Sequence, residues 1–198
     1  IAENCVQATV AVISANAAGA GSGVIVNDKG LILTAAHVVA ATGDDVFIVF
    51  NDGSRRKGKC LGADFDRDAA MIQMEVKPGE TVPYVDVADS DLTTKNAWCV
   101  SIGHPGGFDP TRTAPLRLGR ILSVDRFVNT DCAIVGGDSG GPLFDTKGRV
   151  IGIHSNIGAS LSQNRHVPVS AFHDYWDEMK DGQRRGRRFA ANGGVDPN

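Results

Sequence analysis

The stretch Val135-Gly-Gly-Asp-Ser-Gly-Gly-Pro142 sets one serine among four glycines. Glycine has no Cβ, so this loop can turn sharply and direct several backbone N–H groups toward one point. A serine exposed there is a candidate nucleophile, and the N–H groups around it can stabilise an oxyanion. Because a serine hydroxyl is a weak nucleophile alone, catalysis would also require a base and a group that orients the base. Taken alone, the stretch also fits a glycine-rich turn with an incidental serine.

Two upstream stretches supply the missing groups. Thr34-Ala-Ala-His37 follows a predicted strand and opens a short apolar helical turn, which is a rigid seat for a catalytic base. Asp66-Arg-Asp-Ala-Ala70 carries Asp68 at the start of an apolar strand. A carboxylate at this position can lie at the edge of the core, partly shielded from water. Asp64 and Asp66 are interpreted as acids of a solvated loop. Each motif alone also fits a packed core histidine or a surface acid, and the presence of all three favours catalysis.

The three motifs, in the order His37, Asp68, Ser139, resemble the trypsin/chymotrypsin-fold serine proteases rather than subtilisins or α/β-hydrolases. Four further stretches resemble the bacterial HtrA/Deg branch of that family, namely residues 21–26, 101–105, 130–134 and 150–153. The resemblance extends over about residues 5–180. It implies a serine endopeptidase that hydrolyses polypeptide substrates, in protein quality control or in the processing of unfolded proteins.

The pattern of elements predicts the fold class. Around a dozen short strands, separated by turns rich in Gly, Asn and Asp, indicate an all-β protein. The alternation of apolar residues does not separate a sandwich from barrels. The resemblance implies two six-stranded Greek-key barrels of the chymotrypsin-like fold, with the triad in the cleft between them and a short C-terminal helix.

A trypsin-like serine protease domain is expected over residues 1–182. Its parts are a first barrel over about 5–76, a crossing over 77–96, a second barrel over about 97–169 and a helix over about 170–181. Residues 6–13 are expected to form the first strand, and Ser170 is expected to cap the helix, whose apolar face packs on the core. Residues 183–198 are rich in Arg and Gly without an apolar period, so a disordered tail or linker is expected there.

The composition narrows the function classes. The 198 residues fit one compact domain or two small barrels that share an interface. A net charge of −3 argues against a nucleic-acid partner, and no apolar run approaches the ~18 residues that form a membrane segment. No Cys-x-x-Cys pair occurs among the four cysteines, so no zinc site is expected, and the resemblance implies no metal and no organic cofactor. The chain is large enough to fold without a disulfide.

The resemblance assigns a role to each group of the site. His37 takes the proton from Ser139 as the hydroxyl attacks a peptide carbonyl, and then delivers it to the leaving amine. Asp68 holds the imidazole tautomer and stabilises the transient imidazolium. The oxyanion-hole loop consists of Gly137, Asp138 and Ser139, and the N–H groups of its first and third residues are the donors.

Asp138 departs from the HtrA/Deg pattern, which usually has Asn directly before the serine. Trypsin-like zymogens have Asp there, and the carboxylate pairs with a new N-terminal amine after cleavage. The residues that follow Ile1 do not resemble those of such zymogens. A hydrogen bond from nearby loop groups is therefore the simpler expectation for this carboxylate.

The expected primary specificity pocket comprises Ala133, Ile134, Ile153, His154, Ser155, Asn164 and His166. It lacks an acid where trypsin-like enzymes keep theirs, so a preference for Lys or Arg is not expected. Ile134 matches the HtrA/Deg pattern, which favours Val, Ala, Ile and Leu. His154 follows a run that resembles glutamate-specific bacterial proteases, where this histidine binds the substrate carboxylate, and His166 could converge on the same pocket. Both histidines could instead hydrogen-bond to neighbouring strands.

Other function classes stay open from the sequence. One is a non-catalytic binding or chaperone module on a protease fold, although the complete triad and glycine frame argue against it. Others are a glutamate-specific secreted endopeptidase and an esterase. The resemblance also implies an extracytoplasmic location, periplasmic or secreted, and it allows a homotrimer and a PDZ domain that follows the C-terminus of this chain.

Overall fold

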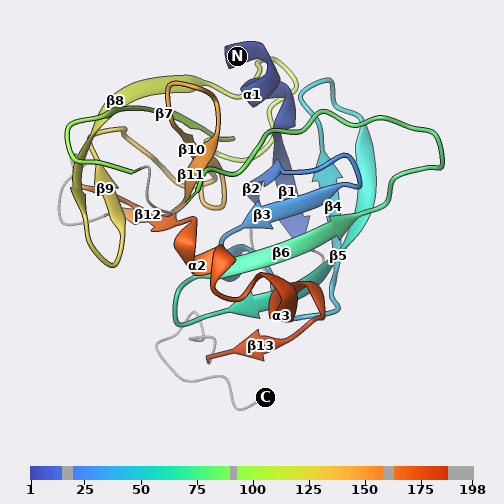
Figure 1. The fold of residues 1–198 in the computed structure, drawn as a ribbon. Coiled ribbons are helices and arrows are strands. Elements are labelled where there is room, and N and C mark those ends of the chain that lie inside the picture. The colour runs from blue at the N-terminus through green and yellow to red at the C-terminus, as the bar shows by residue number, and fades with distance from the viewer. Residues whose placement is uncertain (15–19, 90–92, 158–162, 187–198) are drawn as a thin grey trace.

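The computed structural model describes residues 1–14, 20–89, 93–157 and 163–186. Figure 1 shows two groups of strands side by side, with the helix α2 between them and the helix α3 next to β5 and β6. The elements of the first group are α1 Ala2–Ala8, β1 Thr9–Ser14, β2 Ala20–Ile25, β3 Leu31–Thr34, the 3₁₀ turn η1 Ala36–Val38, β4 Asp45–Val49, β5 Arg55–Asp64 and β6 Ala69–Met74. The elements of the second group are β7 Trp98–Ile102, β8 Leu116–Val124, β9 Val128–Thr130, β10 Pro142–Phe144, β11 Val150–Ile157 and β12 Asn164–Pro168.

Each group closes into a barrel of six antiparallel strands. In the first, the order is β5-β4-β1-β2-β3-β6, and β5 pairs with β6 to close the sheet. In the second, the order is β10-β11-β12-β9-β8-β7, and β10 pairs with β7. The prediction of an all-β protein with two six-stranded barrels is confirmed. Closure leaves few free strand edges, which would otherwise offer unpaired N–H and C=O groups to another chain.

The two barrels share an apolar interface. One cluster of buried side chains includes Ile32, Leu33 and Ile72 of the first barrel together with Phe144 and Ile153 of the second. A smaller cluster, which includes Cys99 and Ile121, fills the second barrel. Burial of each side chain of this size contributes about 1.5–3 kcal/mol to the stability of the folded state. The shared cluster therefore holds the two barrels in a fixed relative position.

Both ends of the described chain differ from expectation. Residues 6–8 belong to the helix α1 rather than to a strand, because Cys5 and Ala8 are spaced to bury one helix face against the first barrel. The C-terminal helix is split into α2 Ser170–His173 and α3 Trp176–Lys180, since Tyr175 leaves the helical conformation at φ −133°. Ser170 is the first helical residue and makes no capping hydrogen bond, so the capping prediction is wrong. Phe172 and Met179 are buried, as expected of an apolar face.

Two smaller predictions also need correction. Arg184–Arg185 forms a short strand, β13, that pairs in parallel with β5, so the segment beginning at 183 is not wholly irregular. Residues 187–198 of the expected tail lie outside the described residues. Asp64 is buried rather than solvated, because its carboxylate accepts the backbone N–H groups of Asp66 and Arg67 and closes the turn that leads to Asp68.

Candidate active site

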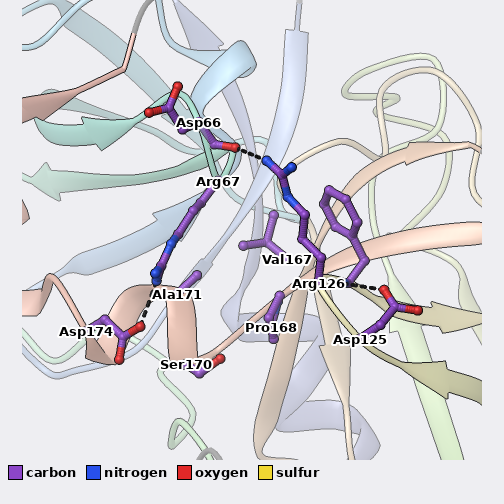
Figure 2. Close-up of a pocket in the computed structure, with 10 residues that line it drawn as sticks. Asp66, Arg67, Asp125, Arg126, Val167, Pro168, Ser170, Ala171 and Asp174 are labelled. Atoms are coloured by element: carbon purple, nitrogen blue, oxygen red, sulfur yellow. Dashed lines mark hydrogen bonds and ion pairs between the residues drawn. The ribbon is translucent and has the colours of Figure 1, made fainter.

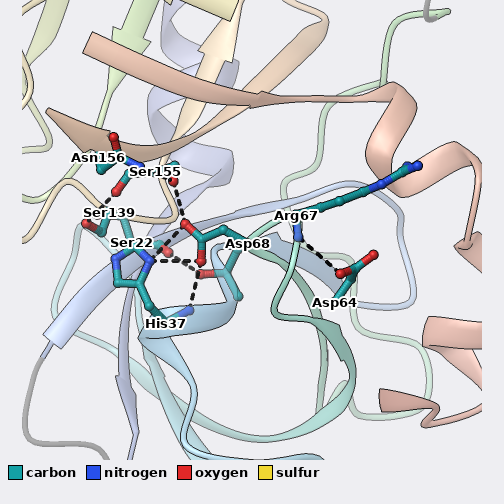
Figure 3. Close-up of polar contacts among 9 residues, drawn as sticks. Ser22, His37, Asp64, Arg67, Asp68, Ser139, Ser155 and Asn156 are labelled. Carbon is teal, nitrogen blue, oxygen red and sulfur yellow. Dashed lines mark hydrogen bonds and ion pairs between the residues drawn. The ribbon is translucent and has the colours of Figure 1, made fainter. Parts of the chain in front are cut away.

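His37 and Asp68 face each other on the side of the first barrel that meets the second (Figure 3). His37 lies in η1, directly after β3, and Asp68 lies in the turn directly before β6, which pairs with β3. His37 Nδ1 lies 2.9 Å from both carboxylate oxygens of Asp68. The backbone N–H of His37 donates to Asp68 Oδ1 at 3.0 Å. A carboxylate on Nδ1 leaves Nε2 as the ring nitrogen that can act as a base.

Asp68 has an unusual backbone conformation. Its φ is +62°, in the left-handed region that few residues other than glycine adopt. The turn is held there by Asp64 on one side and by the bond from Ala36 N–H to the Asp68 carbonyl on the other. Ser155 Oγ of β11 donates a further hydrogen bond to Asp68 Oδ2 at 2.5 Å. The second barrel thus contributes directly to the orientation of this carboxylate.

Ser139 lies in the loop between β9 and β10, close to Ser155 and the His37 ring (Figure 3). Its Oγ lies 3.5 Å from the carbonyl oxygen of Ser155. Within the described part of the chain, no hydrogen bond joins Ser139 Oγ to His37. Catalytic hydrogen bonds are often long or misaligned in free enzymes and shorten when substrate binds. The structure therefore brings the three predicted groups into one region, where Ser139 Oγ points to the Ser155 carbonyl rather than to His37.

Two glycines give the serine loop its shape. Gly137 has φ +95° and Gly140 has φ +85°, so both need a conformation that side chains disfavour. A Cβ on Gly140 would press against the carbonyl oxygen of Ser22 and Thr34 Oγ1. Among the hydrogen bonds of the described residues, none uses the N–H of Gly137 or Ser139. Both donors are therefore free to receive an oxyanion, which is the arrangement that stabilises a tetrahedral intermediate.

Ser22 of β2 anchors this loop across the barrel interface, and the sequence interpretation gave it no role. Its N–H donates to the carbonyl of Ser139 at 2.7 Å, and its Oγ donates to the carbonyl of Gly137 at 2.8 Å. The same Oγ accepts the backbone N–H of His104 at 2.9 Å. The small residues around Ser22 in the stretch 21–23 are the only sign of this close approach in the sequence.

The residues of the expected specificity pocket differ in their exposure to solvent. Ala133 is exposed, while Ile134, Ile153 and Asn164 are buried. The N–H of Ile134 donates to Asn164 Oδ1 at 3.1 Å, which fixes the segment before the serine against β12. Ser155, expected in the same pocket, instead directs its hydroxyl to Asp68.

His154 and His166 form a closed hydrogen-bond chain inside the second barrel, and both are fully buried. His154 Nε2 lies 3.1 Å from the carbonyl oxygen of Ile102, which can only accept, so this nitrogen carries the proton. His154 Nδ1 then accepts from His166 Nδ1 at 2.8 Å, and His166 Nε2 accepts from Thr130 Oγ1 at 2.8 Å. All four ring nitrogens are satisfied. Burial lowers the pKa of His154 well below its ordinary value and lowers the pKa of His166 to about 3, so both rings are neutral.

A cavity of about 410 Å³ lies beside the turn that carries Asp68, between that turn and α2 (Figure 2). Arg67 spans it to pair with Asp174 at 2.7 Å, and Arg126 donates to the carbonyl of Asp66 at 2.6 Å. Its described lining contains neither His37 nor Ser139. Among the described residues, no group of three or more His, Cys, Asp or Glu side chains is placed to hold a metal ion.

Comparison with known proteins places these motifs in a family. A family model described as "Trypsin-like peptidase domain" matches residues 21–153, a range that contains His37, Asp68 and Ser139. A "Probable periplasmic serine endoprotease DegP-like" of Pseudomonas putida (strain GB-1) is 36% identical over 169 residues, 81% of this chain and 35% of that protein. A protein of the same name from Ectopseudomonas mendocina (strain ymp) is 40% identical with the same coverage of both chains.

A solved structure has the same fold. The crystal structure of the serine endoprotease from Yersinia pestis matches with a TM-score of 0.76 and 24% sequence identity, over 90% of this chain and 66% of that one. At this identity the match speaks for the architecture alone. The chain spans about a third of the length of the curated relatives it matches, which are covered to 35%.

Proposed function

Because the chain belongs to the trypsin-like peptidase family, we propose that it is a serine endopeptidase. The observation that carries this proposal is the placement of His37 against Asp68 at 2.9 Å, with Ser139 presented beside them by a loop whose two flanking N–H donors are free. An intact triad with an intact oxyanion hole favours catalysis over a binding module on the same fold.

The geometry supports the following division of roles. His37 Nε2 takes the proton of Ser139 as Oγ attacks the peptide carbonyl, and returns it to the leaving amine. Asp68 keeps the proton of the neutral ring on Nδ1 and stabilises the imidazolium, and its own charge is stabilised by Ser155. The N–H groups of Gly137 and Ser139 receive the oxyanion, and loss of one such donor typically costs about 3–4 kcal/mol of the barrier.

Active-site labelling separates an enzyme from a binding module. A fluorophosphonate probe should label the wild-type protein at Ser139, and Ser139→Ala should abolish both labelling and cleavage of unfolded casein while the circular dichroism spectrum stays unchanged. His37→Ala should be nearly as severe, and the double variant should be no worse than either single variant, because the two residues act as one unit. Casein cleavage that survives in Ser139→Ala would defeat the proposal.

The buried histidines His154 and His166 affect which substrate side chain the enzyme can accept before the cleaved bond. We propose cleavage after small or medium aliphatic residues (Val, Ala, Ile, Leu), in a pocket that includes Ala133 and Ile134. Recognition of a substrate glutamate would need a histidine nitrogen free to donate, but His154 and His166 use all four of theirs inside the barrel. A protonated ring is also disfavoured by burial.

A peptide-library digest tests this preference. Cleavage predominantly after aliphatic residues is the expected result. Cleavage predominantly after Glu that is lost in His154→Ala, with cleavage after Ala retained, would establish the glutamate-specific alternative. Cleavage after Lys or Arg would defeat both, since no acid lies in the expected pocket.

The setting of the enzyme is proposed from its relatives. Their names describe periplasmic, DegP-like endoproteases, and on that ground we propose an extracytoplasmic location. From the family resemblance we also propose a role in protein quality control or in the processing of unfolded proteins. None of the helices in the described residues is long and apolar enough to cross a membrane. A homotrimer and an adjoining PDZ domain remain proposals from the same resemblance, and light scattering on the purified chain tests the first.

A further inference from the structure

Strand β8 turns an arginine toward the serine loop. Arg117 lies on the same side of β8 as the buried Gly119 and Ile121, opposite Ser101 of β7. Its Nη1 lies 3.0 Å from Asp138 Oδ2, and about a quarter of its side chain is exposed (24%). Among the described residues, Asp138 is the acid that lies within ion-pair distance of this guanidinium. A charge on the inner side of a barrel needs such a partner.

Asp138 is more deeply enclosed than Arg117, with no exposed surface at all. Its Oδ2 accepts the N–H of Val135 at 2.9 Å, which closes a turn across the serine loop. Its Oδ1 has no hydrogen-bond partner among the described residues and packs on Gly103, where a Cβ would collide with it. Burial raises the pKa of Asp138, while the N–H of Val135 and the charge of Arg117 act against that rise. The carboxylate is therefore held in place by one hydrogen bond and one cation.

We propose that Arg117 is a positioning residue, which keeps the oxyanion-hole loop in its catalytic conformation by compensating the buried charge of Asp138. This role rests on the proposed peptidase function. Asp138 lies between the two residues whose N–H groups are the proposed oxyanion donors, and its carboxylate accepts the N–H of Val135 across the loop, so movement of this side chain would displace the loop. Without a cation beside it, the carboxylate is stabilised by moving to water, and the backbone of residues 137–139 would move with it.

The choice of arginine has a consequence for pH dependence. A guanidinium stays charged throughout the working range, so the ion pair does not weaken in alkaline solution. Arg112, in the loop before β8, also lowers the pKa of Asp138. His104, which follows Gly103 at the Asp138 carboxylate, and His154 of β11 each have a pKa that burial holds below its ordinary value, so both rings are neutral. Lysine at position 117 would lose its proton near pH 10, so Arg117→Lys should introduce a reversible alkaline loss of activity that the wild-type protein lacks.

A double-mutant cycle on the full chain tests this coupling. Arg117→Met should lower kcat/KM at least about tenfold, mainly through kcat, because it leaves a buried carboxylate unpaired. In the background of Asp138→Asn, which removes the charge, the same substitution should change kcat/KM by no more than about threefold. Arg120→Met is the matched control, since Arg120 lies on the outer side of the same strand over the Trp98 ring, and it should leave activity unchanged.

Equal losses from Arg117→Met in both backgrounds would overturn the proposal, and so would full activity of the single variant. If Arg117→Met does not fold, Arg117→Lys decides, since a flat profile between pH 8 and 11 contradicts the role. If fluorophosphonate does not label the wild-type protein, the proposed peptidase function is wrong. The positioning role of Arg117 is then tested by amide hydrogen exchange of residues 133–142. Exchange should then be faster in Arg117→Met and slow again in the double variant, and unchanged exchange would overturn the proposal.

Discussion

At the scale of single residues, Asp68 depends on contributions from both barrels. Its carboxylate accepts from the backbone and ring of His37, in the first barrel, and from Ser155 Oγ, in the second. The contact with Ser155 is short, at 2.5 Å, as expected when a hydroxyl donates to a charged acceptor. Ser155 also offers its carbonyl oxygen to Ser139. One residue of β11 therefore contacts two of the three proposed catalytic groups, Asp68 and Ser139.

Ser155→Ala should consequently lower kcat without a matching change in KM. A hydrogen bond to a charged group contributes about 1.5–3 kcal/mol, which corresponds to a loss of roughly 10–100-fold in kcat if it acts mainly on the transition state. Steady-state kinetics on a peptide substrate would measure the two constants. Ser54→Ala, in an exposed turn of the first barrel, is the matched control. A change confined to KM would instead place Ser155 in substrate binding, as the sequence suggests.

The sequence predicts the proposed roles of His37, Asp68 and Ser139, but it does not predict the contact of Ser155 with Asp68. This difference has a physical origin. The first three residues lie in motifs whose local residue order already limits their chemistry. The contact of Ser155 with Asp68 joins residues 87 positions apart and depends on how β11 lies against the first barrel. Composition and spacing carry no information on such a contact. The same holds for Arg117 and Asp138, which are 21 positions apart in sequence and meet only because β8 lies beneath the serine loop.

At the scale of elements, β2 is the support on which the serine loop rests. Ser22 makes three hydrogen bonds to Gly137, Ser139 and His104, all on the second barrel. Two of them use the Ser22 hydroxyl, which donates to one group and accepts from another. The proposed oxyanion loop is thus held by Ser22 of the first barrel and, from within, by the hydrogen bond from the Val135 N–H to the Asp138 carboxylate.

Ser22→Ala should therefore reduce activity more than stability. Loss of the hydroxyl leaves the Gly137 carbonyl and the His104 N–H without their partner, at a cost of about 1–3 kcal/mol each if they stay buried. The loop can relieve part of that cost by moving, and this movement misplaces the oxyanion donors. Fluorophosphonate labelling rates should fall, while the melting temperature changes by only a few degrees. Labelling at the wild-type rate would contradict a supporting role for β2.

The orientation of strand β8 does not follow from its sequence pattern. Its outward positions carry Leu116, Leu118 and Leu122, whereas Arg117 and Ser123 lie on the other side with the buried Ile121. The usual alternation of apolar inside and polar outside is reversed over much of this strand. The existence of the strand follows from its apolar content, but which side faces the barrel depends on the pairing with β7 and β9.

At the scale of the whole molecule, stability rests on packing rather than on covalent links. All four cysteines are free and buried, and a single apolar cluster spans both barrels. The sulfur atoms of Cys99 and Cys132 are in contact at 3.7 Å as thiols. Burial raises the pKa of Cys60 to about 12, so this thiol stays protonated and unreactive at neutral pH.

Thiol titration and thermal denaturation should both show that no disulfide stabilises the fold. The native protein should react slowly with a thiol reagent, and the denatured protein should yield all four thiols. A reductant should shift the melting temperature by no more than about 3 °C, since 1 kcal/mol corresponds to about 2–4 °C at this size. Fewer than four thiols, together with a large fall in melting temperature on reduction, would reveal a stabilising disulfide.

The buried histidines also make the whole molecule sensitive to acid. Burial lowers the pKa of His104 to about 4 and that of His166 to about 3, and it lowers the pKa of His154 well below its ordinary value. In the unfolded chain each would titrate near pH 6.5. Between that value and about pH 4 the unfolded chain binds protons that the folded protein does not, so stability falls as the pH falls. Asp138 acts in the opposite sense, because its raised pKa lets the folded protein take up a proton first.

The expected change in the free energy of unfolding with pH is large enough to measure. Each such histidine contributes up to about 1.4 kcal/mol per pH unit, so three of them weigh heavily against a total stability of about 5–15 kcal/mol. Urea denaturation between pH 7 and 4.5 should show the free energy of unfolding falling steeply below pH 6.5. His104→Gln removes one of the three groups and should reduce the slope by about a third. His173→Gln, at an exposed position of α2, should leave it unchanged. A slope that is the same in wild type and His104→Gln would mean that His104 is not held neutral in the folded protein.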